Sequence, residues 1–177
     1  LTTQSFVNCL QDWILHSNLD ISEVESLDFN TLPGSEHIAE ALETHVVLPF
    51  EHPELALKMG LKPKRGVLLY GPPGTGKTSI GRALAHRMKG KFFMIDGTFV
   101  TEPPSAFFGM VHAIVAEAKA NSPSVLFIDD ADVLFNIEHV GGLARYLLTL
   151  LDGLESETAS NVCVMMTAMD VRKVPEA

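Results

Sequence analysis

Short apolar runs alternate with longer amphipathic stretches over most of the chain. Four runs have the length of buried strands and almost no polar interruptions: Val67–Tyr70, Phe92–Ile95, Val125–Ile128 and Val162–Thr167. Between them the apolar positions recur at helical spacing, which predicts three helices, over Thr78–Met88, Phe107–Ala120 and Val140–Leu151. Strands that alternate with helices in this way indicate an α/β fold, with a parallel sheet covered by helices on both faces.

The residues ahead of the first strand follow a different pattern. Apolar residues between Phe6 and Ile14 recur at helical spacing and predict a short helix near residues 3–16, which either packs on the domain or contacts a neighbouring domain or subunit. We therefore divide the chain into a linker region, 1–26, and a nucleotide-binding α/β unit, 27–177. Within the second unit a further helix is predicted from Ser35 to Val47, ended by Pro49 and followed by a loop with Pro53 and Pro63.

The strongest chemical signal follows the first predicted strand. The segment reads GPPGTGKTS and consists of Gly71, Pro72, Pro73, Gly74, Thr75, Gly76, Lys77, Thr78 and Ser79. Its glycines allow successive N–H groups to point inward and form an anion nest, which the positive end of the following helix also faces. In this pattern Lys77 reaches the terminal phosphates of a nucleoside triphosphate, and the Thr78 hydroxyl is a Mg²⁺ ligand.

A second signal lies at the end of the third predicted strand, where four apolar residues lead into Asp129 and Asp130. Ligands of open α/β sheets bind at the carboxyl ends of the strands, the edge at which this acidic pair emerges. Asp129 is a candidate Mg²⁺ ligand, and Asp130 is a candidate catalytic residue that orients or deprotonates an attacking water. Lys77 is the second candidate catalytic residue.

Composition narrows the choice of partners. The net charge of −9 and the absence of a dense basic block argue against a nucleic-acid surface, and no apolar run approaches membrane-spanning length. Cys9 and Cys163 are far apart in the chain, and the seven histidines lack metal-ligand spacing. These features predict reduced thiols, a cytoplasmic protein and no structural zinc.

With these motifs in order, the sequence resembles the AAA family of ring-forming P-loop ATPases that remodel proteins. The resemblance runs from about Leu27 to the end; its most specific parts are SLDFNTLPGSEHIAEALETHVVLPFEHPELALKMGLKPKRGVLLYGPPGTGKT and the run Leu147–Leu154. It implies a sheet of order 5-1-4-3-2, ATP or ADP and Mg²⁺ as cofactors, and adenine contacts near Asp28–Gly34. It also implies a hexameric ring completed by arginines and a helical lid, which together with the fifth strand we expect beyond Ala177. A fragment ending there should be mostly monomeric and nearly inactive.

The chain departs from the family pattern at three places. Asp130 stands where glutamate is usual, and its carboxylate is about 1.5 Å shorter in reach. Met169 falls at the sensor position of the fourth strand, usually asparagine, unless Thr167 or Asp170 takes that role. The loop Thr101–Pro104 lacks the aromatic residue with which threading relatives grip a polypeptide, and the spacing of Phe107 and Phe108 favours a place in the core instead.

Two functions remain open. The first is an ATP-hydrolysing AAA module that works in an oligomeric assembly on a protein partner. The second is a degenerate module that binds nucleotide as a structural or regulatory switch with little turnover. The net acidity and the closer match to the protein-remodelling branch disfavour a DNA-replication switch.

Overall fold

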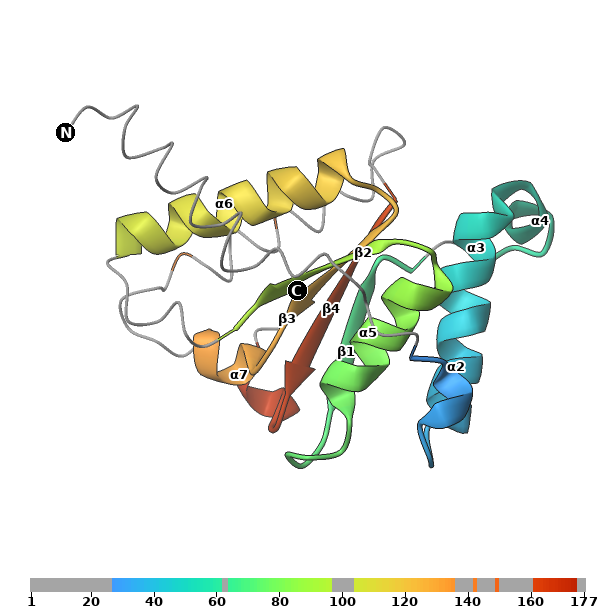
Figure 1. Cartoon of the computed structure of the whole chain (residues 1–177), viewed down its shortest axis with the longest axis horizontal. Coiled ribbons are helices and arrows are strands. Elements are labelled where there is room, and N and C mark those ends of the chain that lie inside the picture. The colour runs from blue at the N-terminus through green and yellow to red at the C-terminus, as the bar shows by residue number, and fades with distance from the viewer. Residues whose placement is uncertain are drawn as a thin grey trace.

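A four-stranded parallel sheet organises the described part of the chain (Figure 1). The computed structural model describes residues 27–61, 64–96, 104–135, 142, 149 and 161–174. The strands are β1 (Gly66–Tyr70), β2 (Lys91–Ile95), β3 (Ser124–Ile128) and β4 (Val162–Ala168). They lie in the order β1-β4-β3-β2, with Ile95 opposite Ile128 and Ile128 opposite Met166. The four predicted strands and the 1-4-3-2 part of the predicted order are confirmed.

Helices cover both faces of the sheet, as the alternating pattern predicts. In Figure 1, α6 (Pro104–Ala120) lies across one face, and α5 (Lys77–Arg87) lies across the other together with α2 (Glu36–Leu42). The short helix α7 (Ala131–Leu134) packs on the α6 side. Each face therefore has its own apolar cluster, one between the sheet and α6, the other between the sheet and α5.

Gly81 sets the distance between α5 and the sheet. A Cβ atom built on Gly81 would lie 2.5 Å from the Cδ2 atom of Phe127, a fully buried residue of β3. No real Cβ approaches a carbon so closely, and Phe127 has no room to retreat within the core. The absence of a side chain at Gly81 therefore allows α5 to rest directly on β3, which places the residues ahead of α5 close to the ends of β3 and β4.

The helix predicted to end at Pro49 continues past this residue, which corrects the sequence prediction. After α2 the chain makes a π-helical segment, η2 (Glu43–Val47), and then α3 (Leu48–Glu51). The N–H of Leu48 donates to the carbonyl of Glu43, five residues back. Pro49 has no N–H to donate to the carbonyl of His45, four residues before it, and this carbonyl instead accepts a 3.0 Å hydrogen bond from the N–H of Lys64. The widened turn and the distant donor satisfy the backbone, so the helix does not break.

Two further boundaries differ from prediction. The segment read as a proline-containing loop forms α4 (Pro53–Lys58), since proline at the first helical position costs no hydrogen bond. Helix α6 begins at Pro104 instead of Phe107. Two short 3₁₀ turns, η1 (Phe29–Thr31) and η5 (Val171–Lys173), complete the described elements. The predicted helix near 3–16 lies outside the described residues, as does that over 140–151 except for Gly142 and Thr149.

None of the helices in the described part of the chain combines the length and the apolar character that crossing a bilayer requires.

Candidate functional site

The predicted phosphate loop connects β1 to α5. Three of its glycines have left-handed backbone angles, with φ of 151° at Gly71, 75° at Gly74 and 81° at Gly76. Residues that carry a side chain rarely adopt these backbone angles, which explains the glycine at each position. The N–H of Gly71 donates to the carbonyl of Ala168 at the end of β4, 3.1 Å away, so the start of the loop is fixed to the sheet. Gly76 caps α5, whose first residues are Lys77 and Thr78.

Lys77 folds back over the loop from which it arises. Its Nζ donates hydrogen bonds to the carbonyls of Gly71, 3.0 Å away, and Pro72, 2.9 Å away. The hydroxyl of Thr75 donates to the same Pro72 carbonyl at 2.9 Å. The ammonium group is therefore held at the concave side of the loop by neutral carbonyls. A phosphate oxygen, being charged, is a stronger acceptor for this donor than either carbonyl.

Asp129 and Asp130 follow β3 directly, as predicted, and each is tied to β4. The hydroxyl of Thr167 donates to Oδ1 of Asp129 at 2.5 Å and accepts a 2.9 Å hydrogen bond from the N–H of Asp130. Asp130 adopts a left-handed conformation, with φ of 48° and ψ of 49°, and α7 begins at the next residue. This turn directs the chain away from the sheet and leaves both carboxyl groups at the carboxyl end of the strands.

The surroundings of Asp130 hold the pKa of its carboxyl group above the ordinary value. Burial raises the pKa of this carboxyl group, and the neighbouring carboxylates of Asp129 and Asp132 raise it further, while Lys77 acts in the opposite direction. A carboxylate with a raised pKa is a better proton acceptor than an exposed one, which suits a group that activates water.

Asp132 supports the site from outside the cavity, a role that the sequence prediction missed. Its side chain is buried, and its Oδ2 accepts hydrogen bonds from the N–H groups of Met169, at 3.2 Å, and Asp170, at 3.1 Å. These bonds join α7 to the turn after β4. The signal available in the sequence was a third carboxylate two positions after the acidic pair, on a segment that otherwise reads as apolar.

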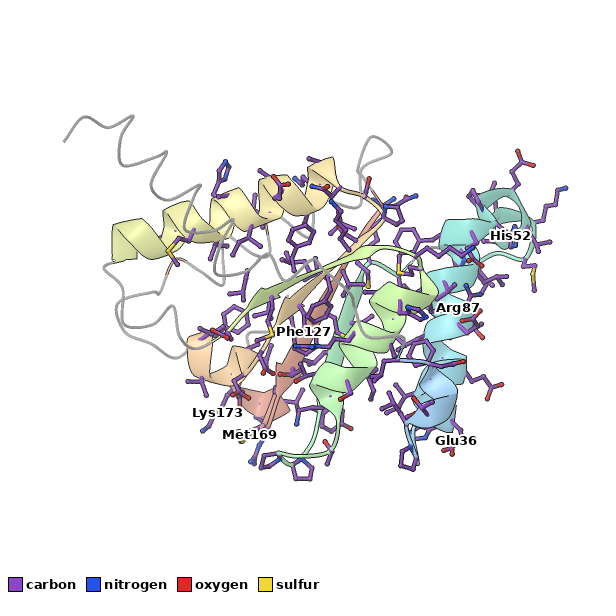
Figure 2. All side chains as sticks on the ribbon, in the orientation of Figure 1. Glu36, His52, Arg87, Phe127, Met169 and Lys173 are labelled. Atoms are coloured by element: carbon purple, nitrogen blue, oxygen red, sulfur yellow. The ribbon has the colours of Figure 1, made fainter. Side chains whose placement is uncertain are left out.

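Loop and strand ends enclose one cavity of about 420 Å³. Its lining consists of Pro73, Gly74, Thr75, Gly76, Lys77, Thr78, Ser79, Asp129, Asp130 and Met169. Figure 2 shows Met169 at the end of the sheet where the loop between β1 and α5 lies. The structure thus brings together the predicted site residues, except that Gly71 and Pro72 lie at the base of the loop.

The donor set of this cavity fits Mg²⁺. Thr78 supplies a hydroxyl oxygen and Asp129 a carboxylate oxygen, the hard oxygen ligands that this ion prefers. Among the described residues, no group of three or more His, Cys, Asp and Glu side chains is placed to hold a metal. Mg²⁺ is usually bound by one or two protein groups together with phosphate oxygens and water, and Thr78 and Asp129 offer two such groups.

Met169, which we expect at the sensor position, reaches the same cavity. It lines the cavity with 49% of its surface exposed. Thr167 cannot take over this role, because its single hydroxyl proton is donated to Asp129. The carboxylate of Asp170 accepts hydrogen bonds from the backbone N–H and the guanidinium of Arg172, at 2.9 to 3.1 Å. Of these three side chains, Met169 is the one that lines the cavity.

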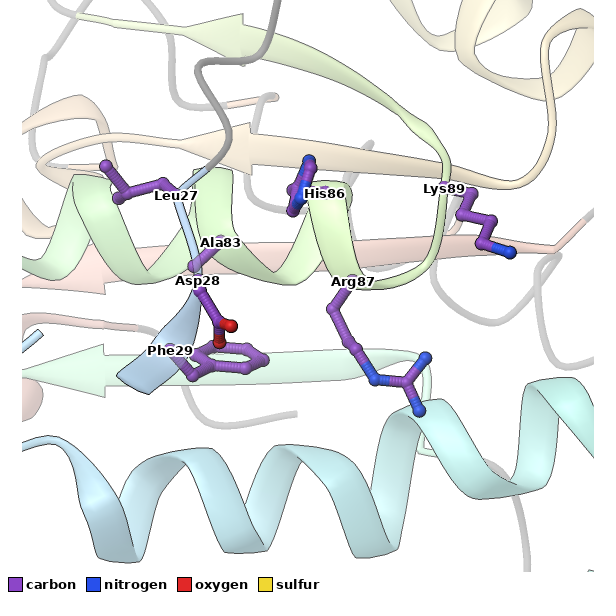
Figure 3. Close-up of a pocket in the computed structure, with 7 residues that line it drawn as sticks. All are labelled: Leu27, Asp28, Phe29, Ala83, His86, Arg87 and Lys89. Atoms are coloured by element: carbon purple, nitrogen blue, oxygen red, sulfur yellow. The ribbon is translucent and has the colours of Figure 1, made fainter. Parts of the chain in front are cut away.

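A second pocket, of about 310 Å³, lies toward the other end of α5 (Figure 3). Three basic side chains line it, His86, Arg87 and Lys89, together with the acidic side chain of Asp28. In Figure 3 they point in different directions, and Arg87 extends toward α2 and α3. There it forms ion pairs with Glu43 and Glu51. The pocket therefore lacks the convergent polar groups that characterise a ligand site.

Residues 67–177 match a family model described as "ATPase family associated with various cellular activities (AAA)". The chain is 37% identical to the Cell division cycle protein 48 homolog of Archaeoglobus fulgidus over 143 residues, which cover 75% of this chain and 19% of that protein. It is 36% identical to the Proteasome-activating nucleotidase of Thermococcus onnurineus over 119 residues, which cover 65% of this chain and 29% of that protein. The chain thus spans less than a third of the length of these curated relatives.

A solved structure gives the same picture. The crystal structure of the FIGL-1 AAA domain in complex with ADP superposes with a TM-score of 0.82 at 29% sequence identity. The superposition covers 99% of this chain and 59% of that one. Fold and sequence therefore agree on one family.

Proposed function

Because this chain belongs to the AAA family of ATPases, we propose that it binds ATP and ADP, together with Mg²⁺, in the cavity between the phosphate loop and the ends of β3 and β4. The observation that carries the proposal is the single cavity lined by Lys77, Thr78, Asp129 and Asp130. A loop of left-handed glycines ahead of a helix offers backbone N–H groups to phosphate, and the two oxygen ligands suit the cation.

Each residue has a distinct role in this proposal. The N–H groups of the loop hold the phosphates, and Lys77 exchanges its carbonyl partners for the β- and γ-phosphate oxygens. Thr78 and Asp129 hold Mg²⁺, which when bound neutralises charge on the phosphates. Asp130 orients the attacking water and accepts its proton, the role for which a raised pKa prepares it.

We further propose that the full-length protein hydrolyses ATP slowly, in a homo- or hetero-oligomeric ring, and remodels a protein partner. Support comes from the similarity to the Cell division cycle protein 48 homolog and the Proteasome-activating nucleotidase. Slow turnover follows from the short reach of Asp130 and from the thioether of Met169, which donates no hydrogen bond to the γ-phosphate. A cytoplasmic location stays a prediction, supported by the buried free thiol of Cys163.

A second candidate function is a nucleotide-dependent structural or regulatory module with little turnover. The observation that favours it is Met169, which reaches the cavity where a polar sensor is expected. Both candidates require nucleotide binding and differ in the rate of hydrolysis.

Replacing Lys77 tests the binding proposal. Lys77→Ala should weaken ADP binding about 100-fold, because charge-assisted hydrogen bonds contribute about 3 kcal/mol. Titration calorimetry with ADP and Mg²⁺ measures the change, and Lys58→Ala, on the exposed surface of α4, is the matched control for loss of one positive charge. Equal affinity in the Lys77→Ala and unmodified proteins would overturn the assignment.

A further inference from the structure

A buried threonine, Thr167, lies next to the carboxyl end of β4, the strand between β1 and β3. Thr167 belongs to β4 and has no exposed surface, while its neighbours along the strand are apolar. From the sequence it reads as a β-branched residue that suits a buried strand. A buried hydroxyl nevertheless needs hydrogen-bond partners, and the structure provides two.

Both partners of Thr167 belong to the acidic pair at the end of β3. Its Oγ1 donates to Oδ1 of Asp129 at 2.5 Å and accepts from the N–H of Asp130 at 2.9 Å. One hydroxyl thus holds the side chain of the first aspartate and the backbone of the second. Among the described residues, Thr167 is the side chain seen to hydrogen-bond the Asp129 carboxylate.

We propose that Thr167 is a positioning residue for the divalent cation, which acts by holding the carboxylate of Asp129 in the wall of the nucleotide cavity. The bond to Oδ1 fixes the side-chain torsion angles of Asp129, so that the carboxylate does not have to be ordered when metal and nucleotide arrive. The inference rests on the function proposed above and adds to it the residue that orients the metal ligand.

The bond to Asp130 serves the same arrangement. Asp130 has left-handed backbone angles, which cost energy for a residue with a side chain. The N–H of Asp130 keeps its hydrogen bond in this conformation because the Thr167 hydroxyl accepts it. Thr167 therefore fixes where the Asp130 backbone turns away from the sheet, and with it the direction from which both carboxylates face the loop.

Thr167→Val tests the inference, because valine has the shape of threonine and lacks the hydroxyl. We expect metal-free ADP to bind as before, in calorimetry with a chelator present. The gain in ADP affinity on adding Mg²⁺ should fall about 10- to 100-fold, the usual cost of removing a group that orients a metal ligand. Electron paramagnetic resonance of Mn²⁺ in the presence of ADP should show the same loss directly. Thr167→Ser keeps the hydroxyl and should restore metal binding.

Ser124→Ala is the matched control for loss of a buried hydroxyl from the same sheet. Ser124 lies at the opposite end of β3, has no exposed surface and donates a 2.7 Å hydrogen bond to the carbonyl of Ala118. This variant should lose stability without any change in the effect of Mg²⁺ on ADP binding.

The outcomes separate the two proposals. An unchanged Mg²⁺ effect in Thr167→Val, or an equal loss in Ser124→Ala, would overturn the role of Thr167 and leave nucleotide binding standing. Failure of the unmodified protein to bind ADP at all would overturn both. Loss of metal-free ADP binding in Thr167→Val would also contradict a role that is specific to the metal ligand.

Discussion

The two sides of the nucleotide cavity are built in different ways. One side is a continuous loop, Gly71–Thr78, whose backbone groups and single lysine arise from adjacent residues. The other side is assembled from residues distant in sequence: Thr167 contacts Asp129 and Asp130 from 38 and 37 positions away, and Asp132 meets Met169 from 37 positions away. The loop side keeps the complete pattern for binding, whereas the assembled side carries the departures, Asp130 and Met169, that we propose slow hydrolysis. If this proposal is right, substitutions on the assembled side should change turnover without changing nucleotide binding.

The largest effect on ATP hydrolysis, and so the strongest test of the difference between the two sides, is expected at Asp130. In the full-length protein, Asp130→Asn should reduce ATP hydrolysis at least about 100-fold, because a general base contributes on the order of 10²- to 10⁴-fold. Asp130→Glu should increase the rate, since the longer side chain brings the carboxylate closer to the water. Phosphate release measures turnover, and ADP affinity should stay unchanged in both variants. Equal rates in all three proteins would remove Asp130 from catalysis and favour the regulatory module.

Phe108 extends the comparison to the handling of a protein substrate. Its ring is partly buried and packs against the apolar cluster between α6 and the sheet. Phe108→Ala should therefore lower the free energy of unfolding by about 2 kcal/mol, less than for a fully buried ring. Denaturant titration measures this loss, with the exposed Lys119→Ala on the same helix as control. Normal stability with a selective loss of substrate remodelling would instead assign Phe108 to substrate contact. The predicted core role of Phe107 stays a prediction, to be tested in the same way.

Met169 tests whether a second residue of the assembled side limits ATP hydrolysis. Met169→Asn places an amide donor in the cavity and should increase ATP hydrolysis about tenfold, the value of one hydrogen bond of about 1.4 kcal/mol. Met169→Leu keeps an apolar side chain and should leave the rate unchanged. The assay is the one used for Asp130. A rate for Met169→Asn no higher than that of the unmodified protein would mean that this position does not limit turnover.

A substitution remote from both sides of the cavity should change neither ADP binding nor hydrolysis. Glu51 pairs with Arg87, which lowers the pKa of the Glu51 carboxyl group. A lowered folded-state pKa means that the stabilisation is present above the unfolded pKa and is lost as the pH falls through the folded value. Because the side chain is 41% exposed, Glu51→Gln should cost only about 0.5 kcal/mol at neutral pH.

This cost should be smaller at about pH 3 than at neutral pH, because protonation of Glu51 through its lowered pKa removes the negative charge that pairs with Arg87. Urea unfolding at the two pH values measures the difference. A change in ADP affinity in Glu51→Gln would show that the ion pair communicates with the cavity.

Sequence reasoning was most successful where the signal is local. The strands, α5, the loop and the position of the acidic pair could all be placed from adjacent residues, because apolar runs and glycine spacing report local geometry. The continuation of the helix through Pro49 could not, since the carbonyl that Pro49 leaves open is satisfied by Lys64, a residue from another segment. The roles of Thr167 and Asp132 were also out of reach. Each depends on which residue of β4 lies beside β3, a register that the sequence does not state.

The close approach of α5 to β3 at Gly81 has a mechanical consequence. Because the Phe127 ring fills the space where a side chain at position 81 would lie, the helix packs directly against the strand with no gap between them. We therefore expect the loop at the start of α5 and the carboxylates at the end of β3 to move together. Any displacement of the loop by an arriving phosphate should be transmitted to Asp129 and Asp130 instead of being absorbed between the layers. Gly81→Ala would push α5 away from β3 and so change the distance between the loop and the two carboxylates, although position 81 contacts neither.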